Sequence, residues 1–385
     1  MFVLYHYGCK QIKINQNKWR VQHMAIQKLW KKGLIGALAI SMLAACSDSS
    51  SGTNEVNGDL TLEEITTKAK EEGTVNSVGM PDTWANWVET WEELGTEYSL
   101  KHKDTDMSSA EELAKFEAEK DDATADIGDV GIAFGPIAKD KGLTLPYKTS
   151  YWDEIPDWAK DDEGHWIVGY TGTISFLTDK NNVKDAPKSW EDLKNGDYTV
   201  SIGDALTANQ AQFAILAAAM AFGGDESNIQ PGIDFFAELA KQGRLQGDPS
   251  VANLEKGEID VAILWDFNAL GYRHQIDENR FDVVIPKEGS VTSGYATIIN
   301  KYAKNPHAAM LAREYILSDE GQENLAKGYA RPIRDKVDLP QDVKDLLLPA
   351  NMYNNAQPVK DQKKWEETTK QIPQLYQEQV LIHAK

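Results

Sequence analysis

One short apolar run constrains the fold of this chain more than any other feature. Residues 261–264 are all apolar, and two of the four are β-branched, which is typical of a strand buried on both faces of a mainly parallel sheet. Trp265, Asp266 and Phe267 follow at its carboxyl end. Ligands of open α/β sheets bind outside such ends. Either these side chains line a ligand cleft, or the rings are core residues and Asp266 caps the next helix.

The first 46 residues differ in charge from the rest of the chain. They contain seven Lys or Arg and no Asp or Glu, and an apolar run at 34–43 follows the lysines that come after Met24. This is the pattern of a secretory signal, and the run is too short for a permanent membrane span. We therefore expect residues 1–46 to be a leader whose true start is Met24.

The leader ends in a sequence that resembles the lipidation signal of bacterial lipoproteins. Residues 43–46 read Leu-Ala-Ala-Cys, with small side chains before the thiol of Cys46 that would take the lipid. The alternative is an ordinary cleaved signal that ends in a chance cysteine. Residues 47–59 are mostly polar and suit a flexible tether. Cys9 lies in the leader, so the mature chain would have no disulfide.

Removal of the leader would leave a strongly acidic protein. The whole chain has a formal net charge of −20, and loss of the seven basic residues at 1–46 makes it −27. Such a surface repels nucleic acid and anionic lipid, so we expect no nucleic-acid partner. The net charge does not constrain a ligand that is held in a local cleft.

Other expected strands also end next to side chains that could meet a ligand. Strands expected at 74–80, 125–132 and 198–202 are followed by Trp84, by Phe134, and by Thr207 and Asn209. Free amides at the start of a helix favour anions and acceptor oxygens. The alternatives are that Thr207 and Asn209 only cap a helix, and that Trp84 belongs to a core stripe with the tryptophans at 87 and 91.

A long β-rich run at 165–178 is interrupted by Gly169 and Gly172. Central glycines give the backbone freedom, which suits a hinge between two lobes. A bulged strand within one domain is the alternative. Tyr170 and Thr171 lie between the two glycines and therefore at the expected crossing.

The order of elements after residue 281 resembles that of the type II solute-binding proteins of bacterial ABC importers. A strand ending at Pro286 leads through a Gly-rich link to a strand at 294–300, then to Asn-Pro at 305–306, a helix ending at Leu317, and Ser-Asp-Glu-Gly-Gln at 318–322. The resemblance includes the maltose-, polyamine-, ferric-ion- and thiamine-binding branches. It implies an α/β fold of two lobes joined by crossing strands, with a ligand cleft between them.

The resemblance also implies domain boundaries and pocket positions. Lobe 1 would comprise residues 60–170 and 290–318, and lobe 2 residues 174–286 and 322–385, with crossings at 169–173 and 286–290. The positions that match the family's pocket regions, together with the side chains considered above, are Trp84, Phe134, Tyr170, Thr171, Thr207, Asn209, Trp265, Asp266 and Tyr295.

The function implied by the resemblance is capture of a small polar solute outside the cytoplasmic membrane. The lobes would close over the solute, and the closed protein, a lipid-anchored monomer without cofactor or metal, would dock on an ABC permease served by ATPase subunits. Trp265-Asp266-Phe267 stands where ferric-ion binders carry adjacent tyrosines, so iron is disfavoured. An indole face and a carboxylate suit an ammonium group, which favours an amine-bearing, polyamine-like solute. A phosphorylated, phosphonate or other anionic solute is the alternative.

The sequence offers less support for two other classes of protein. The sequence has no Gly-x-Ser-x-Gly and no His-Glu-x-x-His, which are motifs of serine hydrolases and zinc proteases, so we expect no enzyme. A structural or adhesive surface lipoprotein is the remaining alternative, although the chain has no internal repeat.

The lipidation signal leads to a first prediction. Replacement of the thiol in Cys46→Ser should release the protein from membranes, because a hydroxyl cannot form the thioether. Fractionation of cells followed by immunoblotting measures this. Retention of the variant in the membrane fraction, at the level seen for a Ser49→Ala control, would contradict the assignment of the anchor.

Overall fold

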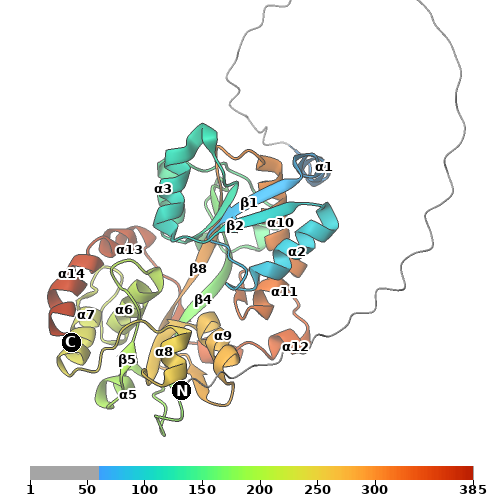
Figure 1. The fold of residues 1–385 in the computed structure, drawn as a ribbon. Coiled ribbons are helices and arrows are strands. Elements are labelled where there is room, and N and C mark those ends of the chain that lie inside the picture. The colour runs from blue at the N-terminus through green and yellow to red at the C-terminus, as the bar shows by residue number, and fades with distance from the viewer. Residues whose placement is uncertain (1–59, 385) are drawn as a thin grey trace, which may run out of the picture. The chain divides into compact units, whose positions relative to one another are not determined.

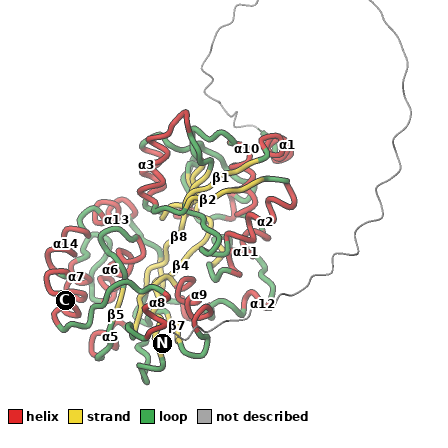
Figure 2. Tube along the Cα trace, viewed as in Figure 1, coloured by secondary structure: helices red, strands yellow, loops and turns green. Residues whose placement is uncertain are grey.

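The computed structural model describes residues 60–384, which form a mixed α/β fold (Figure 1). The leader, Cys46 and the tether lie outside the described residues. Strands run through the middle of this part of the chain and helices flank them (Figure 2).

The strands are β1 (Thr74–Val78), β2 (Lys101–Thr105), β3 (Ile127–Gly131), β4 (Trp166–Asp179), β5 (Val200–Ser201), β6 (Val261–Trp265), β7 (Phe281–Val284), β8 (Ser290–Ile299), β9 (Arg331–Pro332) and β10 (Ala356–Gln357). The helices are α1 (Leu62–Glu72), α2 (Trp87–Tyr98), α3 (Ser109–Glu119), α4 (Phe134–Asp140), α5 (Trp190–Asn195), α6 (Asn209–Ala221), α7 (Gln230–Lys241), α8 (Val251–Lys256), α9 (Asp266–Ile276), α10 (Pro306–Ile316), α11 (Asp319–Lys327), α12 (Gln341–Lys344), α13 (Gln362–Thr369) and α14 (Ile372–Gln379).

The described strands join in the order β2-β1-β3-β8-β4-β6-β5, with β10 beside β8 and with β7 and β9 beside β4. Pairing is parallel between β2, β1 and β3 and between β6 and β5, and it is antiparallel where β8 and β4 meet their neighbours along this order. The apolar run at 261–264 is buried as predicted, but its surroundings are not mainly parallel, because β4 pairs with β6 antiparallel.

β4 belongs to two groups of strands. Its residues 166–173 pair with β8, whereas residues 174–179 pair with β6 and β7. All 14 of its residues are buried. The chain thus passes from one group of strands to the other without leaving an extended conformation, at the place where the sequence predicted a crossing. The division into two lobes at these boundaries stays a prediction.

The two central glycines of β4 have different roles. The register between β4 and β8 shifts between Val168 and Tyr170, which marks a bulge at Gly169. At Gly172, an added Cβ would lie only 2.6 Å from the ring of Phe267, so the strand and the start of α9 can approach closely only because a side chain is missing.

β8 is longer than the strand expected at 294–300. It begins at Ser290, because residues 292–294 pair with residues 171–173 of β4 and residues 290–291 pair with β10. Pairing with partners distant in the sequence therefore extends the strand into the expected Gly-rich link.

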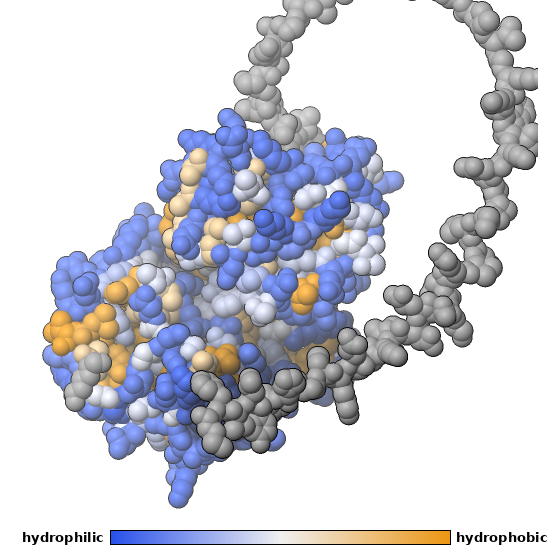
Figure 3. Space-filling model, viewed as in Figure 1, coloured by the Kyte–Doolittle hydropathy of each residue, from blue (hydrophilic) through white to orange (hydrophobic). Residues whose placement is uncertain are grey.

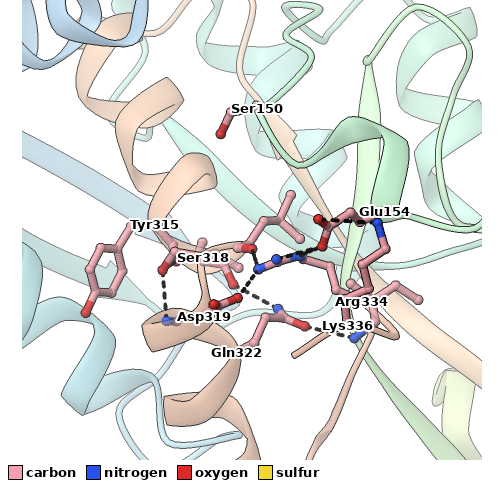
Figure 4. Close-up of polar contacts among 12 residues, drawn as sticks. Ser150, Glu154, Tyr315, Ser318, Asp319, Gln322, Arg334 and Lys336 are labelled. Carbon is pink, nitrogen blue, oxygen red and sulfur yellow. Dashed lines mark hydrogen bonds and ion pairs between the residues drawn. The ribbon is translucent and has the colours of Figure 1, made fainter. Parts of the chain in front are cut away.

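The start of α11 anchors the bulge of β4, and Figure 4 shows Ser318 and Gln322 in this region. The hydroxyl of Ser318 accepts a hydrogen bond from the backbone N–H of Gly321, which starts α11. Gln322 donates to the carbonyl of Gly169 at 2.7 Å and to that of Ile316 at 2.8 Å, and it accepts from the N–H of Ile333 at 2.8 Å. The polar residues of this motif thus satisfy backbone groups that burial would otherwise leave without partners.

Arg334 stabilises the position of the start of α11. Its guanidinium contacts Glu154 at 2.7 Å and Asp319 at 2.8 Å, and it donates to the carbonyl of Leu317 at 2.7 Å (Figure 4). Arg334 is 6% exposed, so these contacts balance its buried charge.

The visible surface of the described part is mostly hydrophilic, with small apolar areas (Figure 3). Between residues 60 and 384, the structure contains no helix that is both long and apolar enough to span a membrane.

The contacts of Gln322 lead to a second prediction. Gln322→Leu should lower the free energy of unfolding by about 2–4 kcal/mol, because it leaves two carbonyls and one N–H buried without partners. Urea denaturation measures this, and the exposed Gln374→Leu serves as a matched control. Equal stabilities of the two variants would show that the hydrogen bond from Gln322 to the carbonyl of Gly169 contributes little to stability.

Candidate functional site

An aromatic cluster lies beside the carboxyl end of β6. Its members come from the loop before α2, from β4, from the start of α9 and from β8: Trp84, Tyr170, Phe267 and Tyr295. The ring of Trp84 lies 5.3 Å from Phe267 and 5.5 Å from Tyr295, in both cases edge to face. Tyr170 stacks on Tyr295 with 5.6 Å between ring centroids. Such pairs bury apolar area and hold each other's orientation.

A chain of hydrogen bonds connects the aromatic cluster to a buried carboxylate. The indole N–H of Trp84 donates to the hydroxyl oxygen of Tyr170 at 2.6 Å, and this hydroxyl donates to Oδ2 of Asp129 at 2.7 Å. Asp129 is 3% exposed, and its Oδ1 has no hydrogen-bond partner among the described residues. One oxygen of a buried carboxylate is therefore left without a partner at the edge of the aromatic cluster.

The surroundings of Asp129 are acidic. Burial raises the pKa of Asp129 to about 8, against the opposing hydrogen bond from Tyr170. Burial also raises the pKa of Glu112, which accepts from the N–H of Asp129 at 3.2 Å, and the pKa of Asp104. No Lys or Arg of the described residues contributes to the shift at Asp129. A cation placed here would be stabilised by these groups.

Two glycines make room for the carboxylate of Glu112. A Cβ on Gly79 would lie 2.4 Å from it and a Cβ on Gly128 would lie 2.6 Å from it. Gly79 also has φ of +71°, a conformation that favours glycine. Because both positions are glycine, the side chain of Glu112 fits between β1 and β3.

The start of α6 and the end of β6 bring hydrogen-bond donors to the hydroxyl of Tyr295. The side-chain amide of Asn209 and the indole N–H of Trp265 lie against the Tyr295 hydroxyl and moderate the rise of its pKa that burial causes. Neither donor makes a hydrogen bond of standard geometry within the described residues. Gln210 accepts from the backbone N–H of Trp265 at 2.9 Å, which holds α6 beside the end of β6.

Asp266 is buried and its carboxylate is engaged. Oδ1 accepts from the N–H groups of Thr173 at 2.9 Å and of Phe267 at 3.0 Å, and Oδ2 accepts from the hydroxyl of Tyr353. The guanidinium of Arg331 lies 3.8 Å over the ring of Tyr353. These contacts join α9 to β4, and a direct contact between Asp266 and a ligand stays a prediction.

The remaining residues predicted from the sequence lie in varied surroundings. Thr171 is buried in β4, with its hydroxyl 3.4 Å from the carbonyl of Arg331. Thr207 is exposed and donates to Asp204 at 2.8 Å. Phe134 packs against a second hydrophobic core that contains Trp166. The structure thus brings Trp84, Tyr170, Trp265, Tyr295 and Asn209 together, whereas Phe134 and Thr207 have other neighbours.

Sequence reasoning missed Asp129 and did not select Phe267. Asp129 lies in a five-residue strand whose other members are apolar or glycine. A single carboxylate in a strand of that kind was an available signal, because a buried charge needs a partner or a function. Phe267 was noted next to Asp266, but the sequence contains no sign that its ring faces Trp84.

A metal site elsewhere in the described residues has little support. Asp161, Glu163 and His165 bring ligand atoms within 4.8 Å of one another. However, the ammonium of Lys139 lies 2.7 Å from Asp161 and 2.9 Å from Glu163. Lys139 thus already supplies the positive charge that a metal ion would bring.

A cavity of about 360 Å³ lies between the end of α6 and the segment that joins β7 to β8, away from the aromatic cluster. Its carboxylates support the fold, since Glu288 accepts from the N–H of Trp190 at 3.1 Å and Glu226 from that of Asp361 at 2.8 Å. We therefore place the candidate site at the aromatic cluster, where a buried carboxylate lacks a partner.

Comparison with known proteins connects this chain to extracellular binding proteins. Residues 122–357 match the family model described as "Bacterial extracellular solute-binding protein". An uncharacterised protein of Haemophilus influenzae is 31% identical over 61% of this chain and 70% of its own length. A sulfate-binding protein of Escherichia coli is 29% identical over 42% of this chain. The chain spans about half the length of this second relative, 52%.

Solved structures share the fold. The periplasmic binding protein AfuA of Actinobacillus pleuropneumoniae, with fructose-6-phosphate bound, has a TM-score of 0.66 at 21% identity and covers 80% of this chain and 98% of its own. The spermidine/putrescine-binding protein PotD of Streptococcus pneumoniae has a TM-score of 0.63 at 16% identity, with coverages of 81% and 99%. A ferric binding protein of Campylobacter jejuni has a TM-score of 0.62 at 20% identity, with coverages of 79% and 98%.

The buried carboxyl of Asp129 leads to a third prediction. Its pKa is raised from 3.8 to about 8 in the folded protein. The folded state therefore keeps a proton that the unfolded state releases, and its contribution to stability, complete below pH 4, is lost as pH rises through 8. Asp129→Asn should remove up to about 1.4 kcal/mol per pH unit of this decline.

Urea denaturation of both proteins between pH 5 and pH 8 measures the difference. The exposed Asp157→Asn is the control and should follow the wild-type curve. Parallel curves for Asp129→Asn and the wild type would refute a raised pKa at Asp129.

Proposed function

Since the chain belongs to the bacterial extracellular solute-binding proteins, as its order of elements indicated, we propose that it captures a small amine-bearing solute outside the cytoplasmic membrane. The predicted type II α/β fold is confirmed by the similar solved structures. The identity of the solute is the part that the proposal adds.

The observation that carries the proposal is the unpartnered Oδ1 of Asp129 next to the aromatic cluster. An ammonium group gains from a carboxylate and from the faces of aromatic rings. Trp84 and Tyr170 are oriented by the same hydrogen bonds that lead to Asp129. The site is thus arranged before the solute arrives, which lowers the entropic cost of binding.

The protonation state of Asp129 couples binding to pH. With a pKa of about 8, this carboxyl carries a proton in the empty protein at pH 7. An arriving ammonium stabilises the charged form and so lowers the pKa. Binding of an amine should therefore release up to one proton.

Delivery would follow from closure of two lobes about the crossing strands. Differential contacts with the solute would favour the closed state, and the closed monomer would dock on an ABC permease with its ATPase subunits. The continuous pairing of β4 with both groups of strands supports this hinge position. Attachment to the membrane through a lipid on Cys46 completes the proposal.

An anionic solute is the second candidate. The donors of Asn209, at the start of α6, and of Trp265, at the end of β6, favour it. The surroundings of Asp129 disfavour it, because no Lys or Arg of the described residues contributes there to balance an added negative charge.

The fourth prediction tests capture of an amine. At pH 7, putrescine, spermidine or propylamine should bind the purified protein and raise its melting temperature. Titration calorimetry in phosphate and in Tris should give different heats, since a released proton is taken up by the buffer. Asp129→Asn should weaken binding at least tenfold, because it removes the charge that pairs with the ammonium.

Two variants serve as matched controls. Asp157→Asn removes a carboxylate and Trp152→Ala removes an aromatic ring. Both replace residues outside the aromatic cluster and should bind as the wild type does. The proposal fails if no amine of this panel binds, or if Asp129→Asn binds all of them normally.

A further inference from the structure

We propose that the solute is a short zwitterion, whose ammonium group meets Asp129 and whose anionic group meets the side chains of Asn209 and Trp265. This inference rests on the proposed capture of an amine, and it adds the second charge of the solute.

Two buried donors at the site lack an acceptor of standard geometry among residues 60–384. Trp265 is 1% exposed, and its indole N–H has no partner among the described residues; the same holds for the buried side-chain nitrogen of Asn209. A buried donor that lacks a well-directed acceptor destabilises the fold. The Tyr295 hydroxyl lies beside both donors but makes no hydrogen bond of standard geometry with either, so an added acceptor would complete both.

Both donors lie beside the same hydroxyl group. Both lie against the hydroxyl of Tyr295, whose pKa is raised by burial, so the hydroxyl keeps its proton and is itself a donor. Asn209 is the first residue of α6, a helix of 13 residues without an acidic side chain in its first turn. The positive end of the helix dipole therefore adds to the attraction for an anion.

The distance between Asp129 and Asn209 also fits a short solute. Asp129 and Gly131 are two residues apart on β3 and hence on the same face of the strand. A Cβ on Gly131 would lie 2.9 Å from the side-chain nitrogen of Asn209, so Asn209 abuts this face. Two residues of a strand span about 7 Å, which is the reach of a zwitterion with a few carbons between its charges.

The two ends of the proposed site, at Asp129 and at Asn209, also differ in charge. Acidic side chains gather at the Asp129 end, where Glu112 accepts from the N–H of Asp129 and the charge of Asp104 adds to the rise of the Asp129 pKa. The Asn209 end offers neutral donors. Tyr170 donates to Asp129 at one end, and Tyr295, on which it stacks, has its hydroxyl beside the donors at the other end. A diamine would place its second ammonium against donors, which is unfavourable, whereas an anionic group would complete their hydrogen bonds.

The fifth prediction compares probes that differ in one charge. Titration calorimetry of the full chain at pH 7 should show that aminoethylphosphonate or β-alanine binds at least tenfold more tightly than propylamine. Ethylphosphonate and propionate, which lack the amine, should bind at least tenfold more weakly than their zwitterionic counterparts. The tighter of the two zwitterions identifies the anionic group as a phosphonate or a carboxylate.

Two variants test the donors. Asn209→Leu and Trp265→Phe should each lower the preference for the zwitterion over propylamine at least fivefold, because each removes one N–H group. The exposed Asn195→Leu should keep the wild-type preference. Melting curves of all variants establish that they are folded, and two independent positions keep the test valid if one variant is not.

The outcomes separate this inference from the proposed function. If propylamine or putrescine binds as tightly as both zwitterions, or if both variants keep the preference, the zwitterion is wrong while amine capture stands. If only the amine-free anions bind, both are wrong and the site is anionic in its specificity. If none of these probes binds, both are refuted as well.

Discussion

β4 pairs through its first half with β8 and through its second half with β6 and β7. Because one strand belongs to both groups, it fixes where the ends of the other strands meet. Tyr170 and Thr173 lie on this strand, one donating to Asp129 on β3 and the other to Asp266 at the start of α9. The aromatic cluster thus depends on a backbone ladder as well as on its own side chains. Gln322 holds the bulge that sets the register of this ladder.

The candidate site contains buried acidic groups that no basic residue of the described chain balances. Asp129 and Glu112 are buried side by side without a basic partner among the described residues, and burial raises the pKa of both. Arg334 illustrates the contrast, since two carboxylates balance its buried charge. An uncompensated buried carboxylate costs stability. The proposed binding of a positively charged group would compensate it.

Much of the fold could be predicted from local patterns. The apolar run at 261–264 is a buried strand, the capping box of Thr61 and Glu64 starts α1, and Ser318 starts α11. These features depend on residues a few positions apart. The extent of β8 and the antiparallel neighbour of β6 could not be predicted, because each depends on pairing with β4, more than 80 positions away.

By itself, the sequence determined the class of fold, the buried strand at 261–264 and several of the side chains that lie near its end. Only the tertiary structure decided how they are used. It engaged both oxygens of Asp266 within the fold, and it left an oxygen of Asp129 and the indole N–H of Trp265 without partners. The physical reason is that strand and helix patterns record local preferences, whereas the satisfaction of a buried polar group depends on what distant segments bring beside it.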